Sequence, residues 1–269
     1  MSSESTTREP VLRFTDGEPS EADDSVVVEE PLEIRIGERP VAVTMRTPGD
    51  DFDLAVGFLI TEAIVARTGE IDAVRHWGSP NVVRVMLREG VTIDFERLRR
   101  HFYATSSCGI CGKASIDAVR VRVRAVESDL RIDAGVVRSL PETLRKQQRA
   151  FAQTGAIHGA ALFAPGGELV QAREDIGRHN AVDKAVGALL LAGTPMERMI
   201  LAVSGRASFE IVQKALVAGI PAIVAVGGAS SLAIDLAREF GMTLIGFARG
   251  ASFNVYAGAQ RVDRLTRSS

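Results

Sequence analysis

Short apolar segments that alternate with helical segments in the second half of the chain constrain the fold more than any other feature. Residues 199–203, 222–226 and 243–247 are nearly continuous apolar runs with the length of buried strands. Runs of this kind occur where helices cover both faces of a mostly parallel sheet. We therefore expect an α/β domain with a mostly parallel sheet and with helices near 181–191, 209–217 and 232–240.

The first half of the chain shows two different periodicities. Apolar residues alternate with polar ones in 32–36 and 41–45, on either side of Gly37, which predicts a β-hairpin with one buried face. From 52 to 64 the apolar residues recur every three or four positions, which predicts a helix with Asp50 as its N-cap. This mixture indicates a smaller α+β unit.

The composition along the chain suggests three parts. Residues 1–24 are rich in Ser, Thr, Glu, Asp and Pro and have little apolar surface, so we expect a disordered tail. Residues 25–134 are expected to form the α+β N-terminal domain. Residues 135–269 are expected to form the larger α/β domain.

The net charge, the apolar runs and the cysteine count argue against several classes of protein. A net charge of -2 over 269 residues gives no electrostatic reason to expect nucleic-acid binding. The sequence holds no uninterrupted apolar run of roughly 18 residues, so we expect no membrane span. The N-terminus lacks a basic segment followed by an apolar one, and the chain has only 2 cysteines. These features predict a cytoplasmic protein with reduced thiols.

Each of the three predicted strands ends in a loop that contains glycine. The loops include Ser204-Gly205-Arg206, residues 227–230 and Ala248-Arg249-Gly250. Carboxyl ends of parallel strands share one edge of a sheet, where ligands bind and where glycine lets the backbone approach them. Arginine side chains there can contact phosphate in a bidentate manner. The loops predict a site for a phosphate-bearing ligand, although neither a Walker loop nor the G-x-G-x-x-G fingerprint is present.

The stretch REDIGRHNAVDK, residues 173–184, concentrates charged and polar side chains at a strand-to-helix junction. Arg178, His179 and Asn180 could bind a polar ligand and supply a titratable imidazole. The same residues could instead form a capped helix start with intrahelical ion pairs. The sequence leaves both interpretations open. His158, beside a predicted strand, is expected to be a core histidine.

The two cysteines, Cys108 and Cys111, stand in the motif TSSCGICGK. A structural zinc site needs four ligands, and neither a second C-x-x-C nor an H-x-x-x-H pair is present. A catalytic zinc of the deaminase type would also need an H-x-E motif, which is absent, so we expect no metal at this motif. The C-x-x-C spacing fits disulfide redox chemistry, but the glycines indicate a pliable loop rather than a thioredoxin-type helix start. Group transfer through a persulfide is the third option, with Lys113 favouring the thiolate. The polar, glycine-rich surroundings disfavour the remaining option, two inert buried thiols.

The motifs TSSCGICGK, HGAALF, REDIGRHNAVDK, SGRASFEIVQKALVAGIPAIVAV and TLIGFARGASFNVY together resemble the formate dehydrogenase accessory sulfurtransferase family, FdhD, from about residue 28 to 256. The resemblance implies a sulfurtransferase that receives a persulfide from a cysteine desulfurase. The sulfur would pass to molybdenum bis(molybdopterin guanine dinucleotide), a bound substrate that the formate dehydrogenase apoenzyme requires. The resemblance implies no catalytic metal in the protein itself, and it makes the larger domain similar to the cytidine deaminase fold.

The resemblance also assigns roles to residues. It makes Cys108 the persulfide carrier, with Cys111 in support, and it places cofactor binding on Phe247, Ala248, Arg249, Gly250, Ala251 and Ser252. To these we add, from the loops and the 173–184 stretch, Ser204, Gly205, Arg206, Arg178, His179 and Asn180. We expect a homodimer, since a long parallel sheet with apolar helices leaves room for one. A thiol-disulfide oxidoreductase and a non-enzymatic cofactor chaperone are the alternatives.

Overall fold

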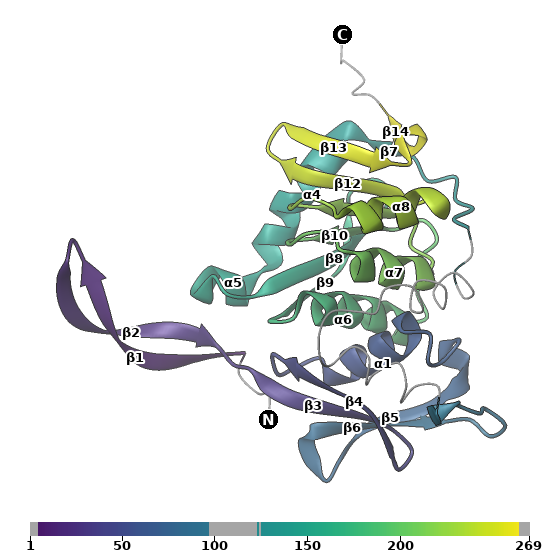
Figure 1. The fold of residues 1–269 in the computed structure, drawn as a ribbon, viewed down its shortest axis with the longest axis horizontal. Coiled ribbons are helices and arrows are strands. Elements are labelled where there is room, and N and C mark those ends of the chain that lie inside the picture. Colours follow the sequence, from purple (N-terminus) through teal and green to yellow (C-terminus); the bar gives the residue numbers. More distant parts are fainter. Residues whose placement is uncertain (1–4, 97–122, 124, 264–269) are drawn as a thin grey trace.

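The computed structural model describes residues 5–96, 123 and 125–263, so Cys108 and Cys111 lie outside the described residues. The larger unit is built on a six-stranded sheet with the order β13-β12-β11-β10-β8-β9 (Figure 1). Its strands are β8 (His158–Phe163), β9 (Leu169–Asp175), β10 (Ile200–Val203), β11 (Ala222–Ala225), β12 (Thr243–Arg249) and β13 (Ser252–Ala257).

The strand directions correct the expectation of a mostly parallel sheet. β10, β11 and β12 run parallel to one another, while β8, β9 and β13 each pair antiparallel with a neighbour. The reason is loop length, because β8–β9 and β12–β13 are joined by short turns that can only connect antiparallel strands. The fold is therefore mixed α/β, and the likeness to cytidine deaminase stays a prediction.

Helices cover both faces of this sheet, as predicted (Figure 1). Alternate residues of β10 show this, since Leu201 and Val203 belong to one core cluster and Ile200 and Ala202 to the other. The expected helices are all present. One face carries α6 (Arg178–Leu191), α7 (Phe209–Val217) and α8 (Ser231–Glu239), and the other carries α4 (Ala134–Gln147) followed by α5 (Arg149–Thr154).

The boundary between the two halves lies earlier than residue 134. Leu130 and Ile132 are fully buried in the core under α4, and β7 (Ile132–Asp133) pairs with β14 (Val262–Asp263). Residues 125–133 therefore pack with the C-terminal half. The sequence did not reveal this because the pairing joins segments that are 130 positions apart. A short 3-10 helix, η2 (Ala259–Arg261), precedes β14.

The smaller unit is a four-stranded sheet, in the order β4-β3-β6-β5, with one helix against it. The hairpin around Gly37, whose φ is 57°, and the helix after Asp50 are confirmed. Asp50 is the N-cap residue, but it is left-handed and its side chain makes no capping bond. The elements are β3 (Glu30–Ile36), β4 (Arg39–Arg46), α1 (Asp51–Thr61), η1 (Thr68–Glu70), β5 (Ile71–Trp77) and β6 (Ser79–Leu87).

A close crossing of α1 and α6 joins the two units. A Cβ atom on Gly57 of α1 would overlap the carbonyl oxygen of Asp183, and one on Gly187 of α6 would overlap that of Asp53. The two helix backbones therefore touch at a pair of glycines. This contact holds the smaller sheet against the larger unit.

The N-terminal segment is a hairpin rather than a disordered tail. β1 (Thr6–Thr15) and β2 (Glu18–Val27) pair antiparallel over their full length and extend away from the rest of the molecule (Figure 1). Asp16 and Gly17 both have positive φ, as the favoured two-residue hairpin turn requires. We name this hairpin the arm. Its Thr6 hydroxyl donates to the side-chain oxygen of Gln153 on α5 at 3.1 Å.

None of the helices within residues 5–96 and 125–263 combines the length and the apolar character that crossing a bilayer requires.

Candidate ligand-binding site

The three strand-end loops meet at one edge of the larger sheet, as the sequence predicted. The Gly227 N–H donates to the Gly205 carbonyl at 2.9 Å, and the Phe247 N–H donates to the Gly227 carbonyl at 2.9 Å. The Ser204 N–H donates to the Gly159 carbonyl at 2.9 Å, which adds the start of β8 to the same edge. The loops are therefore a hydrogen-bonded group.

Two glycines allow this close approach. A Cβ atom on Gly227 would lie 3.1 Å from the Cα atom of Arg206. A Cβ atom on Gly228 would lie 2.8 Å from the ring of Phe247, which has a φ of 51° and is 46% exposed. One face of the Phe247 ring thus packs on the loop at Gly228, and the rest of the ring is exposed to solvent.

A cavity of about 670 Å³ opens beside these loops, on the side of the sheet covered by α4 and α5. The Arg249 Nε donates to the Val226 carbonyl at 3.1 Å, which orients this guanidinium at the rim. Arg145 stacks on Phe151 with 3.8 Å between its guanidinium carbon and the ring centroid. The wall from the loops contains Ser204, Val226, Ala248 and Arg249, and the wall from the helices contains Glu142, Arg145, Gln148 and Phe151.

The cavity combines an aromatic surface, a carboxylate acceptor and arginine donors. An aromatic ring and a planar guanidinium can stack on a heteroaromatic base. The Glu142 carboxylate can accept N–H bonds from that base. Arg249 can pair with a phosphate. The arrangement therefore suits a nucleotide.

Three of the predicted loop residues line this cavity: Ser204, Ala248 and Arg249. The other predicted loop residues belong to the same edge but are not part of the cavity lining in the described structure. They are Gly205, Arg206, Phe247, Gly250, Ala251 and Ser252.

The helix wall was missed by the sequence analysis. Glu142, Arg145 and Phe151 lie in and beyond a polar helical segment that carried no recognisable motif. His158 was expected in the core, but it is half-buried and lines the cavity. Burial and the nearby Arg178 lower the pKa of His158. The sequence signal that could have identified the helix wall is a cluster of basic residues followed by an aromatic residue, Phe151.

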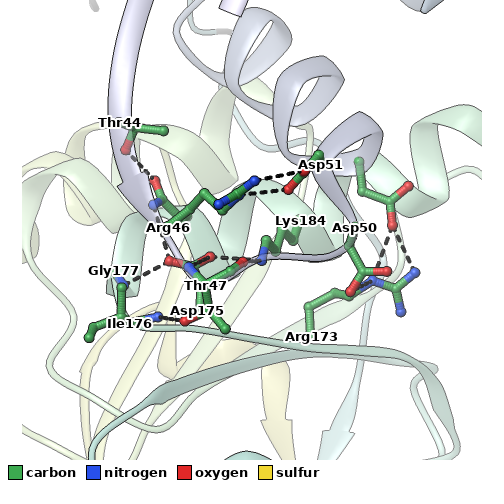
Figure 2. A network of polar contacts seen from close by, with 12 residues as sticks. Thr44, Arg46, Thr47, Asp50, Asp51, Arg173, Asp175, Ile176, Gly177 and Lys184 are labelled. Carbon is green, nitrogen blue, oxygen red and sulfur yellow. Dashed lines mark hydrogen bonds and ion pairs between the residues drawn. The ribbon is translucent and has the colours of Figure 1, made fainter. Parts of the chain in front are cut away.

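Much of the 173–184 stretch forms an internal ion network, shown in Figure 2. The Lys184 ammonium lies 2.7 Å from the Asp175 carboxylate, and both side chains are buried. Lys184 also donates to the Thr47 carbonyl at 2.7 Å, while Asp175 accepts from the Thr47 N–H at 3.2 Å. This network fastens the β4–α1 connection to β9 and α6.

Asn180 belongs to the same network. Its amide donates to the Met45 carbonyl at 2.8 Å and to Asp175 at 3.1 Å, and its oxygen accepts from the Thr44 hydroxyl at 3.2 Å. The hydrogen bonds of the Asn180 amide thus hold the two halves together. We therefore leave Asn180 out of the proposed ligand site.

Two further residues of this stretch, Arg173 and Asp183, contact the smaller unit. Arg173 lies 2.7 Å from Asp53 and 3.3 Å from Asp50. Figure 2 shows Arg173 beside Asp50. Asp183 lies 2.9 Å from Lys214 and accepts from the Thr61 hydroxyl at 2.7 Å. Burial raises the pKa of Asp183, and the Lys214 ammonium opposes that shift. The stretch therefore forms ion pairs between elements rather than the expected intrahelical ones, and α6 begins after Gly177 without a side-chain cap.

Arg178 and His179, at the start of α6, remain available to a ligand. The Arg178 Nε and the His179 Nε2 are buried and have no hydrogen-bond partner within the described residues. Burial, with Arg178 and Lys214 nearby, lowers the pKa of His179 to about 4. The imidazole is therefore neutral near pH 7 and offers both a donor and an acceptor.

The fold is that of a mixed α/β protein with a cavity at the carboxyl ends of its parallel strands, which is where α/β proteins commonly bind ligands. The FdhD/NarQ family matches residues 27–263, and the chain belongs to this family. It is 51% identical to the sulfur carrier protein FdhD of Streptomyces avermitilis, over 96% of this chain and 95% of that one. It is 47% identical to the sulfur carrier protein FdhD of Mycobacterium tuberculosis, over 89% and 92%.

A crystal structure from Desulfotalea psychrophila has the same fold. Its TM-score is 0.79 at 24% identity, and the match covers 96% of this chain and 99% of that one. At this identity the comparison concerns the fold alone.

Proposed function

We propose that this protein is a sulfurtransferase that carries a persulfide on Cys108 from a cysteine desulfurase to the molybdenum cofactor of formate dehydrogenase. The observation that carries the proposal is the identity of about half of all positions to relatives named sulfur carrier protein FdhD, over nearly the full chain. The two thiols of the C-x-x-C motif could carry the sulfur, as a sulfur carrier protein requires. The chain from Desulfotalea psychrophila, which shares the fold of this protein, is described as a candidate formate dehydrogenase accessory protein.

The sulfur chemistry needs two steps. In the first, the Cys108 thiolate attacks the outer sulfur of the donor's persulfide, so that a new S–S bond forms and the donor leaves as a thiolate. In the second, the Cys111 thiolate attacks the Cys108 sulfur, and sulfide leaves for the metal of the cofactor. The two electrons that reduce the sulfane sulfur come from the two cysteines, which end as a disulfide that a cellular thiol must reduce.

The cavity supports the cofactor part of the proposal. The acceptor, molybdenum bis(molybdopterin guanine dinucleotide), would be a substrate of this protein rather than its resident cofactor. Its guanine would stack near Arg145 and Phe151 and donate to Glu142, and its phosphates would pair with Arg249 beside Ser204. Arg178 and His179, on the other face of the same sheet edge, are proposed to contact the remainder of the cofactor.

Mass spectrometry tests the sulfur step. The protein and its Cys108→Ala and Cys111→Ala variants are incubated with a cysteine desulfurase and free cysteine, and intact masses and peptides are compared. We expect one reducible sulfur on Cys108 that is lost in Cys108→Ala and kept in Cys111→Ala. A Cys108–Cys111 disulfide without added sulfur would instead favour a thiol-disulfide oxidoreductase. If a variant with both cysteines replaced by alanine still supports formate dehydrogenase activity, a non-enzymatic chaperone would be favoured.

A further inference from the structure

Gln148 is a buried side chain whose donor is unused. It is 3% exposed and lies at the joint between α4 and α5, where the two helices meet. Its Nε2 has no hydrogen-bond partner within the described residues. Buried donors are nearly always paired, because an unpaired one keeps its full desolvation penalty. A bound ligand with an acceptor would remove that penalty.

The position of Gln148 is shared by two cavities. Besides the cavity of about 670 Å³, a second one of about 410 Å³ lies between α4–α5, β9 and the β4–α1 connection. Three residues line both cavities, namely Leu144, Gln148 and Ile157. Since Leu144 and Ile157 are apolar, Gln148 supplies the polar side chain at this junction.

The neighbouring strand leaves room for this amide. A Cβ atom on Gly159 of β8 would lie 2.8 Å from both the amide carbon and the Nε2 of Gln148. Any larger residue at 159 would therefore displace the amide. Gly159 therefore leaves the space that the Gln148 amide occupies, and the amide keeps its donor unpaired in that space.

The second cavity contains a free positive charge. Its Arg173 and Lys184 are paired with acidic residues, and its Glu174 accepts from the Ala150 and Phe151 N–H groups at 2.9 Å. Arg149 is exposed and forms no ion pair in the described part of the chain. Asp50 also lines this cavity and lies 3.3 Å from Arg173, so Arg149 is the cation of the described lining that is left to meet an anion.

We propose that the two cavities form one binding site, in which the Gln148 Nε2 donates to a phosphate oxygen of the bound nucleotide and Arg149 pairs with the same diphosphate. The base lies in the larger cavity, and the diphosphate passes the junction toward the smaller one. The inference rests on the proposed function, since it takes the ligand to be the guanine nucleotide part of the cofactor.

Gln148→Met tests this role, because it keeps the length of the side chain and removes the donor. Binding of GDP and of guanosine is measured by calorimetry, and thermal melting of the free protein by circular dichroism. We expect GDP to bind about tenfold more weakly and guanosine to bind as before. We also expect the free variant to melt at a higher temperature, because the unpaired buried donor is gone.

Matched variants separate the possible results. Gln213→Met on α7, which lines neither cavity, is the control and should leave GDP binding unchanged. Arg149→Gln should weaken GDP binding about tenfold without affecting guanosine. Gly159→Ala should reproduce the loss by displacing the amide.

Two outcomes would overturn the inference, and they differ from each other. If Gln148→Met binds GDP as tightly as the unchanged protein does, or melts lower with no change in affinity, Gln148 has a structural role and the cavities are separate sites. If the unchanged protein itself does not bind GDP, the nucleotide assignment of the proposed function fails, and the role of Gln148 fails with it.

Discussion

At the scale of single residues, Arg249 provides the most direct link between a strand end and the proposed ligand. It follows a buried stretch of β12, lines the larger cavity and is held by the Val226 carbonyl. Arg206, in the neighbouring loop, is exposed and is not part of that lining in the described structure. The two arginines therefore form a natural pair for comparison.

Arg249→Ala should weaken GDP binding about tenfold, because a charge-assisted phosphate contact is lost. Arg206→Ala should change the affinity by less than about twofold, since its side chain does not line the cavity. Calorimetry on both variants checks the prediction. Equal losses in the two variants would show that the site extends over the whole loop edge, as the sequence analysis assumed.

His179 makes a prediction about pH. Its pKa is 6.5 in the unfolded chain and about 4 in the folded protein, because burial, Arg178 and Lys214 disfavour the charged form, while Glu210 and Glu62 act in the opposite direction. The unfolded state therefore binds more protons between these values. The stability that neutral His179 contributes is complete above pH 6.5 and is lost as the pH falls toward 4.

The check is urea unfolding of the protein and of His179→Asn between about pH 7 and pH 4. Carboxylate titrations are common to both proteins and cancel in the difference. The unchanged protein should lose more free energy of unfolding over this range than the variant does. Parallel curves for the two proteins would contradict the low pKa of His179.

The sequence predicted the loop half of the site and missed the helix half, for a physical reason. Ser204, Ala248 and Arg249 follow buried strands, and parallel strands place their carboxyl ends together whatever the rest of the fold is. Glu142 and Phe151 reach the cavity through the packing of α4 and α5 on the sheet. Local periodicity identifies the apolar face of a helix but not the strand end that it reaches.

At the scale of elements, short turns determine the features that the sequence did not predict, namely the strand directions at the sheet edges and the N-terminal hairpin. Periodicity located β10, β11 and β12 and the helices between them, since buried strands and amphipathic helices have distinct patterns. Strand direction at the sheet edges depended on tight turns, such as the one at Gly250. The arm depended on Asp16-Gly17, a favoured hairpin turn between segments whose polar composition suggested disorder.

The crossing of α1 and α6 gives a prediction about stability. Gly57→Ala places a methyl group against the backbone of Asp183, so the helices must move apart, and we expect a loss of about 3 kcal/mol in the free energy of unfolding. Gly69→Ala is the control, because a Cβ atom there meets no atom within 4 Å. Urea unfolding of both variants checks this. A loss below about 1 kcal/mol for Gly57→Ala would contradict the close crossing.

At the scale of the whole molecule, the two units pack together and the arm projects away from them (Figure 1). The α1–α6 crossing and the buried Asp175–Lys184 pair fix the smaller sheet against the larger one. The arm carries Leu12 and Phe14, which are 61% and 65% exposed. An isolated two-stranded hairpin is marginal in water, so these side chains are candidates for contact with another molecule.

The homodimer stays a prediction, and charge suggests how the arm would take part. Residues 5–27 contain six acidic and two basic residues, whereas residues 134–154, which span α4 and α5, contain four basic residues and one acidic residue. In a homodimer, the arm of one copy would therefore be complementary in charge to this surface of the second copy. Sedimentation of a Leu12→Ser, Phe14→Ser double variant should show a shift from dimer to monomer.

The free energy of unfolding of the monomeric double variant should change by less than about 0.5 kcal/mol, because both side chains are exposed. A monomeric unchanged protein, or a double variant that remains dimeric, would exclude this use of the arm.

The most direct test of the account follows labelled sulfur from the carrier to its acceptor. The protein is loaded with ³⁵S by a cysteine desulfurase, then mixed with formate dehydrogenase that contains unsulfurated cofactor, and transferred label and restored activity are measured. We predict transfer by the unchanged protein, no loading of Cys108→Ala, and normal loading but slow transfer by Arg249→Ala. Transfer by Arg249→Ala at the unchanged rate would separate the cavity from the sulfur chemistry and contradict the account.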